Sequence, residues 1–369
     1  MPVLPQELID EIIDHLANCS DHLRTCSLVS RAWVPRCRSH LFKTCRLYSH
    51  SVVGFRDILS VPGCTFLRDI CEIDVCKSSC DEVTSGYLDE IAPVLASLTS
   101  IRALRMTFGH SLRRAFFCNG FSTGFPNVTR LTLSFQGHYD GEPGAPLIDL
   151  IRLFPVLQEL YISRFDGIVS DPSPQAVPPP GLRRLELQDD ALRPILMWVS
   201  VSKHPKVDSL TLSNLCGNAA VVRAATAQMR DLRHLDIDLT WSMESGGNHT
   251  PILDFLPHSS VRTLIVRDTS HDLEHANVHE MMLLITKLSS PTLESLTMDL
   301  NLLLYMNMDW GALDTAWPKR FPRLQNVLVE CGRHDGHSDH GQFLYEALPL
   351  LAASRMLSIK YTATPIVYW

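Results

Sequence analysis

The sequence lacks the features that would assign it to a membrane-spanning, secreted or nucleic-acid-binding class. No stretch approaches the roughly 18 uncharged apolar residues of a membrane span. The N-terminus, MPVLPQELIDEIIDHL, carries acids where a secretory signal has basic residues before an apolar run. Lys and Arg number 33 against 40 Asp and Glu, which gives a formal net charge of −7. Nucleic acid and anionic membrane both call for a basic surface, so we expect neither as a partner.

Disulfide, cofactor and nucleophile signals are also missing. The 11 cysteines are odd in number and follow no export signal, which predicts reduced, mostly buried thiols. Neither a standard Gly-rich phosphate loop nor a Gly-x-Ser-x-Gly elbow is present. We therefore expect a protein of the cytosol, the nucleus or both, with no cofactor and no enzymatic activity.

Two constellations keep a metal-dependent or hydrolytic enzyme open as an alternative. Three imidazoles and a thiolate, spaced by three residues, would suit tetrahedral zinc, but the glycines among them favour a solvated loop; these are Cys331, His334, His337 and His340. His234 and Asp236 could orient a base for hydrolysis, but no nucleophile motif accompanies them. A further group consists of Cys64, Cys71, Cys76 and Cys80. Their spacing does not match a zinc ribbon, which predicts packed thiols.

One six-residue pattern, apolar-x-x-apolar-x-apolar, recurs through most of the chain at intervals of 25 to 32 residues. Its last positions alternate apolar and polar, which predicts a strand with one buried face. Clear copies begin at Ile101, Val128, Leu157, Leu182, Val207, Leu232, Val261, Leu293 and Leu324. Weaker copies begin at Phe42, Ile70 and Met356.

Segments with helical spacing separate the copies, so each unit reads as a strand followed by a helix. Such units can build a doubly wound sheet, a barrel or a solenoid. The polar third and fifth positions favour a solenoid, because strands of a doubly wound sheet are buried on both faces. The expected helices are 52–60, 87–98, 147–154, 219–229, 278–288 and 343–352, and long irregular insertions are expected at 137–146, 166–180, 241–251 and 301–318.

The Leu-x-x-Leu-x-Leu pattern resembles the core of the leucine-rich-repeat family over residues 42 to 361. The resemblance implies an α/β horseshoe, with a parallel sheet on the concave face and helices on the convex face, spanning residues 48–369. The family usually places Asn or Cys three residues after the last Leu, and here Asn301 alone conforms among the clear copies. We therefore expect an irregular horseshoe with uneven turns.

Residues 4 to 47 lie outside the repeats, apart from the strand expected from Phe42, and predict three short helices. Pro5 suits a first helical turn, and an apolar stripe follows it at spacings of one, three and four. Ser20 or Asp21 can begin a second helix and Ser30 a third, which holds Trp33. Three short helices make a marginal core, which a partner or the solenoid would complete.

This segment, with Leu4-Pro5, an apolar stripe and the run LVSRAW from Leu28, resembles an F-box, assigned to residues 1–47. The whole chain resembles the F-box-like proteins that fungi carry in large numbers. The resemblance implies docking to the Skp-type adaptor of a cullin–RING ubiquitin ligase and recruitment of a target protein. The implied adaptor-binding residues are Leu4, Pro5, Leu8, Ile9, Ile12, Ile13, Leu16, Leu28, Val29 and Trp33. The alternative is an interaction scaffold whose helices only cap the solenoid.

The exposed strand positions of the repeats are the expected target-binding surface. Mixed charge with one tyrosine suits a protein or peptide partner better than a polyanion. Third and fifth positions of the middle copies give Arg105, Arg130, Glu159, Tyr161, Arg184, Glu186, His234 and Asp236. Ile265 and Leu328 hold the same register, which predicts an apolar contact unless a loop covers them.

Overall fold

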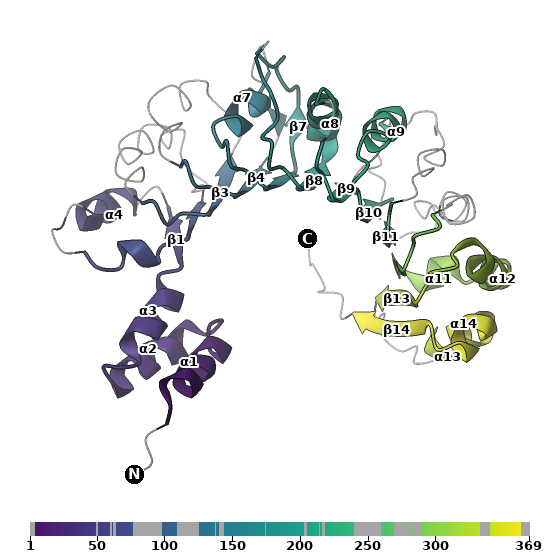
Figure 1. Cartoon of the computed structure of the whole chain (residues 1–369), viewed down its shortest axis with the longest axis horizontal. Coiled ribbons are helices and arrows are strands. Elements are labelled where there is room, and N and C mark those ends of the chain that lie inside the picture. The colour runs from purple at the N-terminus through teal and green to yellow at the C-terminus, as the bar shows by residue number, and fades with distance from the viewer. Residues whose placement is uncertain are drawn as a thin grey trace. The chain divides into compact units, whose positions relative to one another are not determined.

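A computed structural model describes most of the chain (Figure 1). The described residues are 4–48, 51–59, 61, 64–76, 98–108, 125–136, 138–139, 144–173, 175–202, 205–213, 215, 218–239, 260–268, 281, 290–332 and 340–362. The chain divides into two compact units, Met1–Gly181 and Leu182–Trp369.

The first unit opens with three short helices, α1 (Gln6–His15), α2 (Ser20–Val29) and α3 (Val34–Leu41). Pro5 precedes the first turn of α1, which carries Glu7 where an acid favours the positive helix end. Pro35 lies in the first turn of α3, where its missing N–H costs nothing. These helices together are called the helical module below.

A parallel sheet follows the helical module in the first unit. Its strand order is β1–β2–β3–β4–β6, and each neighbour pairs in the parallel sense. The strands are β1 (Thr44–Leu47), β2 (Glu72–Val75), β3 (Ala103–Phe108), β4 (Arg130–Phe135) and β6 (Glu159–Ser163). Connections hold α4 (Val52–Leu59), η1 (Leu67–Asp69), α7 (Leu147–Ile151) and a small two-stranded sheet of β5 (His138–Tyr139) and β7 (Asp166–Gly167).

The second unit continues the same plan with strands in the order β8 to β14, all paired in parallel. They are β8 (Arg184–Gln188), β9 (Ser209–Ser213), β10 (His234–Asp238), β11 (Thr263–Asp268), β12 (Ser295–Leu300), β13 (Asn326–Gly332) and β14 (Leu357–Thr362). The connections hold η3 (Asp189–Ala191), α8 (Leu192–Ser200), α9 (Ala219–Thr226), α11 (Leu302–Tyr305), α12 (Trp310–Arg320), α13 (His340–Ala347) and α14 (Pro349–Ala353).

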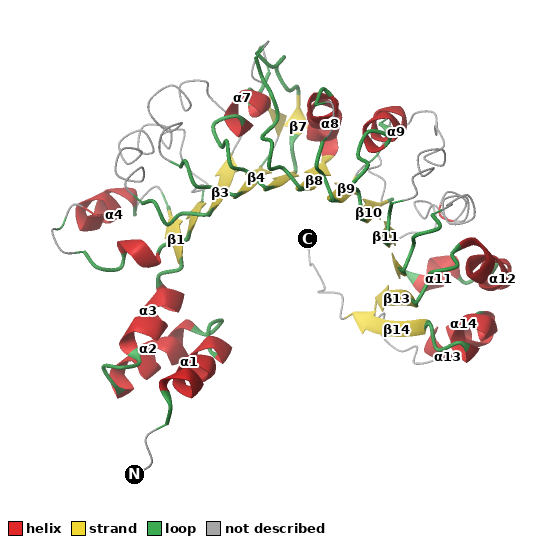
Figure 2. Ribbon diagram, in the orientation of Figure 1, coloured by secondary structure: helices red, strands yellow, loops and turns green. Residues whose placement is uncertain are grey.

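Alternation of side chains along each strand separates a core from an open face. In β4, for example, Leu131 and Leu133 are fully buried while Arg130 is exposed. Within each unit the helices between strands lie on one side of the sheet (Figure 2). We call the side carrying the third and fifth pattern positions the open face of that sheet. No helix in the described ranges is long and apolar enough to cross a membrane.

The strands and the parallel sheet confirm the mixed α/β class expected from the repeat. Every copy of the pattern forms a strand, but the last weak copy is out of frame, because Leu357 rather than Ile359 pairs with Val327. The curvature of a horseshoe and the boundary between residues 47 and 48 stay predictions.

The connections depart from prediction in three places, one of which is the expected helix 343–352, replaced by the two helices α13 and α14. The segment 301–318 was expected to be irregular, yet it holds α11 and most of α12, whose first turn is capped when Asp309 accepts a hydrogen bond from the Ala312 amide at 2.9 Å. Helix α8 was not expected, and it buries Ile195 and Trp198 against the core. The expected helices 87–98 and 278–288 lie almost wholly outside the described residues.

Candidate interaction surfaces

The helical module has a small core of its own. Ile13 is fully buried, and Leu16 and Trp33 pack at its edge. The buried set is Ile9, Ile13, Leu23 and Cys37, with Leu16, Cys26, Trp33 and Leu41 partly buried around it. A core of this size is marginal for an independent fold.

The residues predicted to bind an adaptor therefore separate into a buried pair, an exposed group, and Leu16 and Trp33, which are partly buried at the edge of the core. Ile9 and Ile13 face inward, so their direct role is to hold α1 on the other helices. The exposed group is Leu4, Pro5, Leu8, Ile12, Leu28 and Val29, of which Leu28 has 86% of its surface exposed and Ile12 46%. Apolar side chains this exposed are available to a partner.

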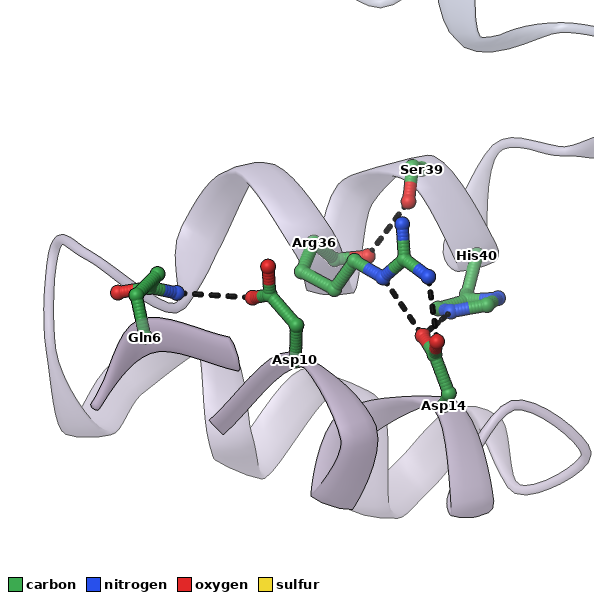
Figure 3. Close-up of polar contacts among 6 residues, drawn as sticks. All are labelled: Gln6, Asp10, Asp14, Arg36, Ser39 and His40. Carbon is green, nitrogen blue, oxygen red and sulfur yellow. Dashed lines mark hydrogen bonds and ion pairs between the residues drawn. The ribbon is translucent and has the colours of Figure 1, made fainter. Parts of the chain in front are cut away.

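A polar cluster that the sequence did not signal joins α1 to α3 (Figure 3). Asp14 accepts from Arg36 Nε at 2.6 Å and pairs with His40 Nε2 at 2.7 Å, and Arg36 also contacts it through Nη2. The hydrogen bonds from Arg36 and then His40 hold the pKa of the Asp14 carboxyl well below its usual range. The Ser39 hydroxyl donates to the Arg36 carbonyl at 2.8 Å. The contacts of Asp14 with Arg36 and His40 hold α1 against α3.

The helical module also contacts the connection that precedes β2. Arg38 Nη2 donates to Thr65 Oγ1 at 2.7 Å, and the rings of Phe42 and Phe66 stack with centroids 4.8 Å apart. Such contacts suit a cap, since the first strand of an array would otherwise expose apolar surface.

On the open face of the first sheet, opposite charges pair with one another. Arg130 Nε donates to Glu159 at 2.8 Å, and the Tyr161 hydroxyl donates to the same carboxylate at 2.9 Å. Arg105 lies 3.7 Å from Asp74, a buried carboxylate that Arg46 also approaches at 3.8 Å. This row of paired charges contains four of the predicted target-binding residues, Arg105, Arg130, Glu159 and Tyr161. It also contains Arg46, Glu72 and Asp74.

The open face of the second sheet holds the other predicted residues, Arg184, Glu186, His234 and Asp236. Asp236 pairs with Arg267, at 2.6 Å from Nη2 and 3.1 Å from Nε, and no hydrogen bond joins it to His234 in the described ranges. A hydrolytic arrangement of His234 and Asp236 would need that bond. Arg267 directly follows Val266, the last position of its copy of the pattern, so it was not among the predicted residues.

The cysteine and histidine constellations do not assemble into a ligand set among the described residues. Cys331 is buried in β13, and burial raises the pKa of its thiol to about 11. His334 and His337 lie outside the described residues, as does Cys80. The described part of the chain holds no group of His, Cys, Asp or Glu able to hold a metal ion.

Comparison with known proteins finds similar solved structures but assigns the chain to no family. No family model matches the chain, and no curated protein matches it. A leucine-rich repeat-containing protein, LegL7, from Legionella pneumophila is 16% identical, with a TM-score of 0.44, over 83% of this chain and 98% of that chain. A Bacteroides fragilis protein is 12% identical, with a TM-score of 0.34, over 87% of this chain and 74% of that chain. What the structure itself shows is a mixed α/β chain with long parallel sheets built from one repeated strand pattern.

Proposed function

We propose that this chain is a non-enzymatic adaptor that docks a Skp-type ubiquitin-ligase subunit through its helical module and holds a target protein on the open faces of its sheets. The compartment is the cytosol or the nucleus, where thiols stay reduced. The ligase would supply the catalytic step.

The observation that carries the docking half is the exposed apolar surface of α1 and α2. Leu8 and Ile12 occupy one face of α1 outside the core, and Leu28 and Val29 end α2 with most of their surface exposed. Leu28 is not part of the core of the helical module. Burying such side chains stabilises a complex by about 1.5–3 kcal/mol each when burial is complete, so a few suffice for a specific contact.

Co-expression with a Skp-type adaptor, followed by size-exclusion chromatography, tests this half. The variant Leu8→Asp/Ile12→Asp should lose co-elution while its circular dichroism stays that of the wild type, because both side chains lie outside the core. Val177→Asp/Val201→Asp is the matched control, since it puts the same two charges at exposed apolar positions outside the helical module. A wild-type chain that never binds the adaptor would refute the docking half.

A second candidate is an interaction scaffold whose helical module only caps the first sheet. The Phe42–Phe66 stack and the Arg38–Thr65 hydrogen bond favour it. A pure cap predicts that Leu8→Asp/Ile12→Asp changes no interaction, whereas Phe42→Ala destabilises the first strands. The two candidates share target binding by the open faces.

A further inference from the structure

The two open faces differ in how their charges are balanced. Among the described positions of the first, three arginines face three carboxylates, and each acid lies within ion-pair distance of an arginine. The second open face carries more acid than base. We call it the acidic face, and it comprises the outward positions of β8 to β14.

Register places the side chains of the acidic face in two adjacent rows. The fifth-position row runs Glu186, Thr211, Asp236, Ile265, Thr297, Leu328 and Ser358. The row two residues further along the strands runs Asp238, Arg267, Asp299, Glu330 and Lys360. With the third-position residues Arg184 and His234, five carboxylates stand against three Arg or Lys side chains and one histidine at the described positions of this face.

Two of these carboxylates have no hydrogen-bond or ion-pair partner among the described residues. Arg267 is committed to Asp236, and Lys360 Nζ pairs with Glu330 at 2.7 Å. Glu186 and Asp299 are half-buried, and neither makes a hydrogen bond or ion pair with any described residue. Asp299 and Glu330 lie on neighbouring strands, and Glu186 and Asp236 lie two strands apart, so repulsion between these like charges reduces stability.

The pKa values agree with that geometry. Burial raises the pKa of Glu186, Asp236 two strands away raises it further, and Arg267 and Arg184 offset part of the increase. Burial also raises the pKa of Asp299, and Glu330 adds to the effect. Residues that a protein keeps at the expense of its stability are commonly retained for function.

Aliphatic side chains lie in the same rows as the acids. Ile265 and Leu328 are half-buried and lie on the two strands that flank Thr297. Two strand spacings separate them by about 10 Å. Asp299 lies in the adjacent row on the strand between them. The acidic face therefore offers apolar contact and unpaired negative charge within one patch.

We propose that the acidic face is the target-docking surface and that its occupant is a protein segment carrying lysine or arginine side chains beside an aliphatic residue. Its cations would pair with Glu186 and Asp299, and its aliphatic side chain would cover Ile265 and Leu328. The inference names the chemistry of the target and rests on the target-binding half of the proposed function. It is independent of docking by the helical module.

Selection from a random-peptide phage library on the immobilised full chain tests the inference. The enriched peptides should be rich in lysine or arginine with an aliphatic residue. A labelled copy of the strongest peptide should bind Glu186→Gln/Asp299→Asn about tenfold more weakly than wild type, the effect of losing about 1.4 kcal/mol of charge pairing. Asp231→Asn/Glu346→Gln removes the same net charge at exposed positions off the acidic face and should bind as wild type does.

Three results would overturn the inference: no enrichment, enriched peptides without a basic excess, or equal weakening by both double variants. Thermal unfolding checks the variant itself, because Glu186→Gln/Asp299→Asn should be at least as stable as wild type once the repulsion is removed. A clear loss of stability would mean that these carboxylates serve the fold. Co-elution with the Skp-type adaptor, measured on the same variants, should not change, so failure of docking and failure of this inference are distinguishable.

Discussion

Truncation to alanine should lower the free energy of unfolding strongly at Ile13 and hardly at all at the adjacent Ile12 of α1. Ile13 is fully buried, so Ile13→Ala removes three carbon atoms from the core of the helical module. At about 0.8 kcal/mol per buried carbon plus the cost of a cavity, the loss is about 3 kcal/mol. Ile12 has 46% of its surface exposed, and alanine has the higher helix propensity. Ile12→Ala should therefore change the free energy of unfolding by no more than about 0.5 kcal/mol.

Hydrogen exchange followed by mass spectrometry measures this locally, on peptides from residues 4–41. A loss of about 3 kcal/mol should speed exchange in the helical module about a hundredfold for Ile13→Ala, up to the limit of complete opening. Ile12→Ala should exchange like wild type but bind a Skp-type adaptor more weakly. Equal exchange in the two variants would refute the assignment of Ile13 to the core and Ile12 to the surface.

Three further predictions concern the second unit. Asp314→Ala should lower the free energy of unfolding in urea by about 2–4 kcal/mol, because its carboxylate accepts from two amides at the start of α14, at 2.8 and 2.9 Å, and Asn should restore part of the loss. Tyr305→Phe removes the hydroxyl that donates to the buried Asp268 and should cost about 1–3 kcal/mol, measured the same way. For Glu186 and Asp299 the folded pKa is raised, so the folded state takes up protons before the unfolded state as the pH falls from neutral. The wild-type protein should therefore gain stability as the pH falls, and the stability advantage of the Glu186→Gln/Asp299→Asn variant in urea unfolding should shrink over the same range. An advantage independent of pH would contradict the raised pKa values of these two carboxyls.

The sequence by itself determined the strands and the face that each of them buries. Leu131, Leu187 and Val327 are all buried as the pattern requires, because alternation along a strand depends only on local backbone geometry. The same alternation identified Arg130, Glu186 and Asp236 as open-face residues. The apolar stripe of α1 likewise predicted that helix, although the stripe contains both core and surface residues.

Only the tertiary structure decided which charges meet. Arg267 lies 31 residues from Asp236 along the chain, and Asp14 lies 22 residues from Arg36. No spacing rule links such pairs, since they depend on the register between strands and on the angle between helices. The same register leaves Glu186 and Asp299 without an ion-pair partner among the described residues. The tertiary structure likewise assigned Ile13 to a core and Ile12 to a surface, because burial depends on what packs against a helix as well as on its own sequence.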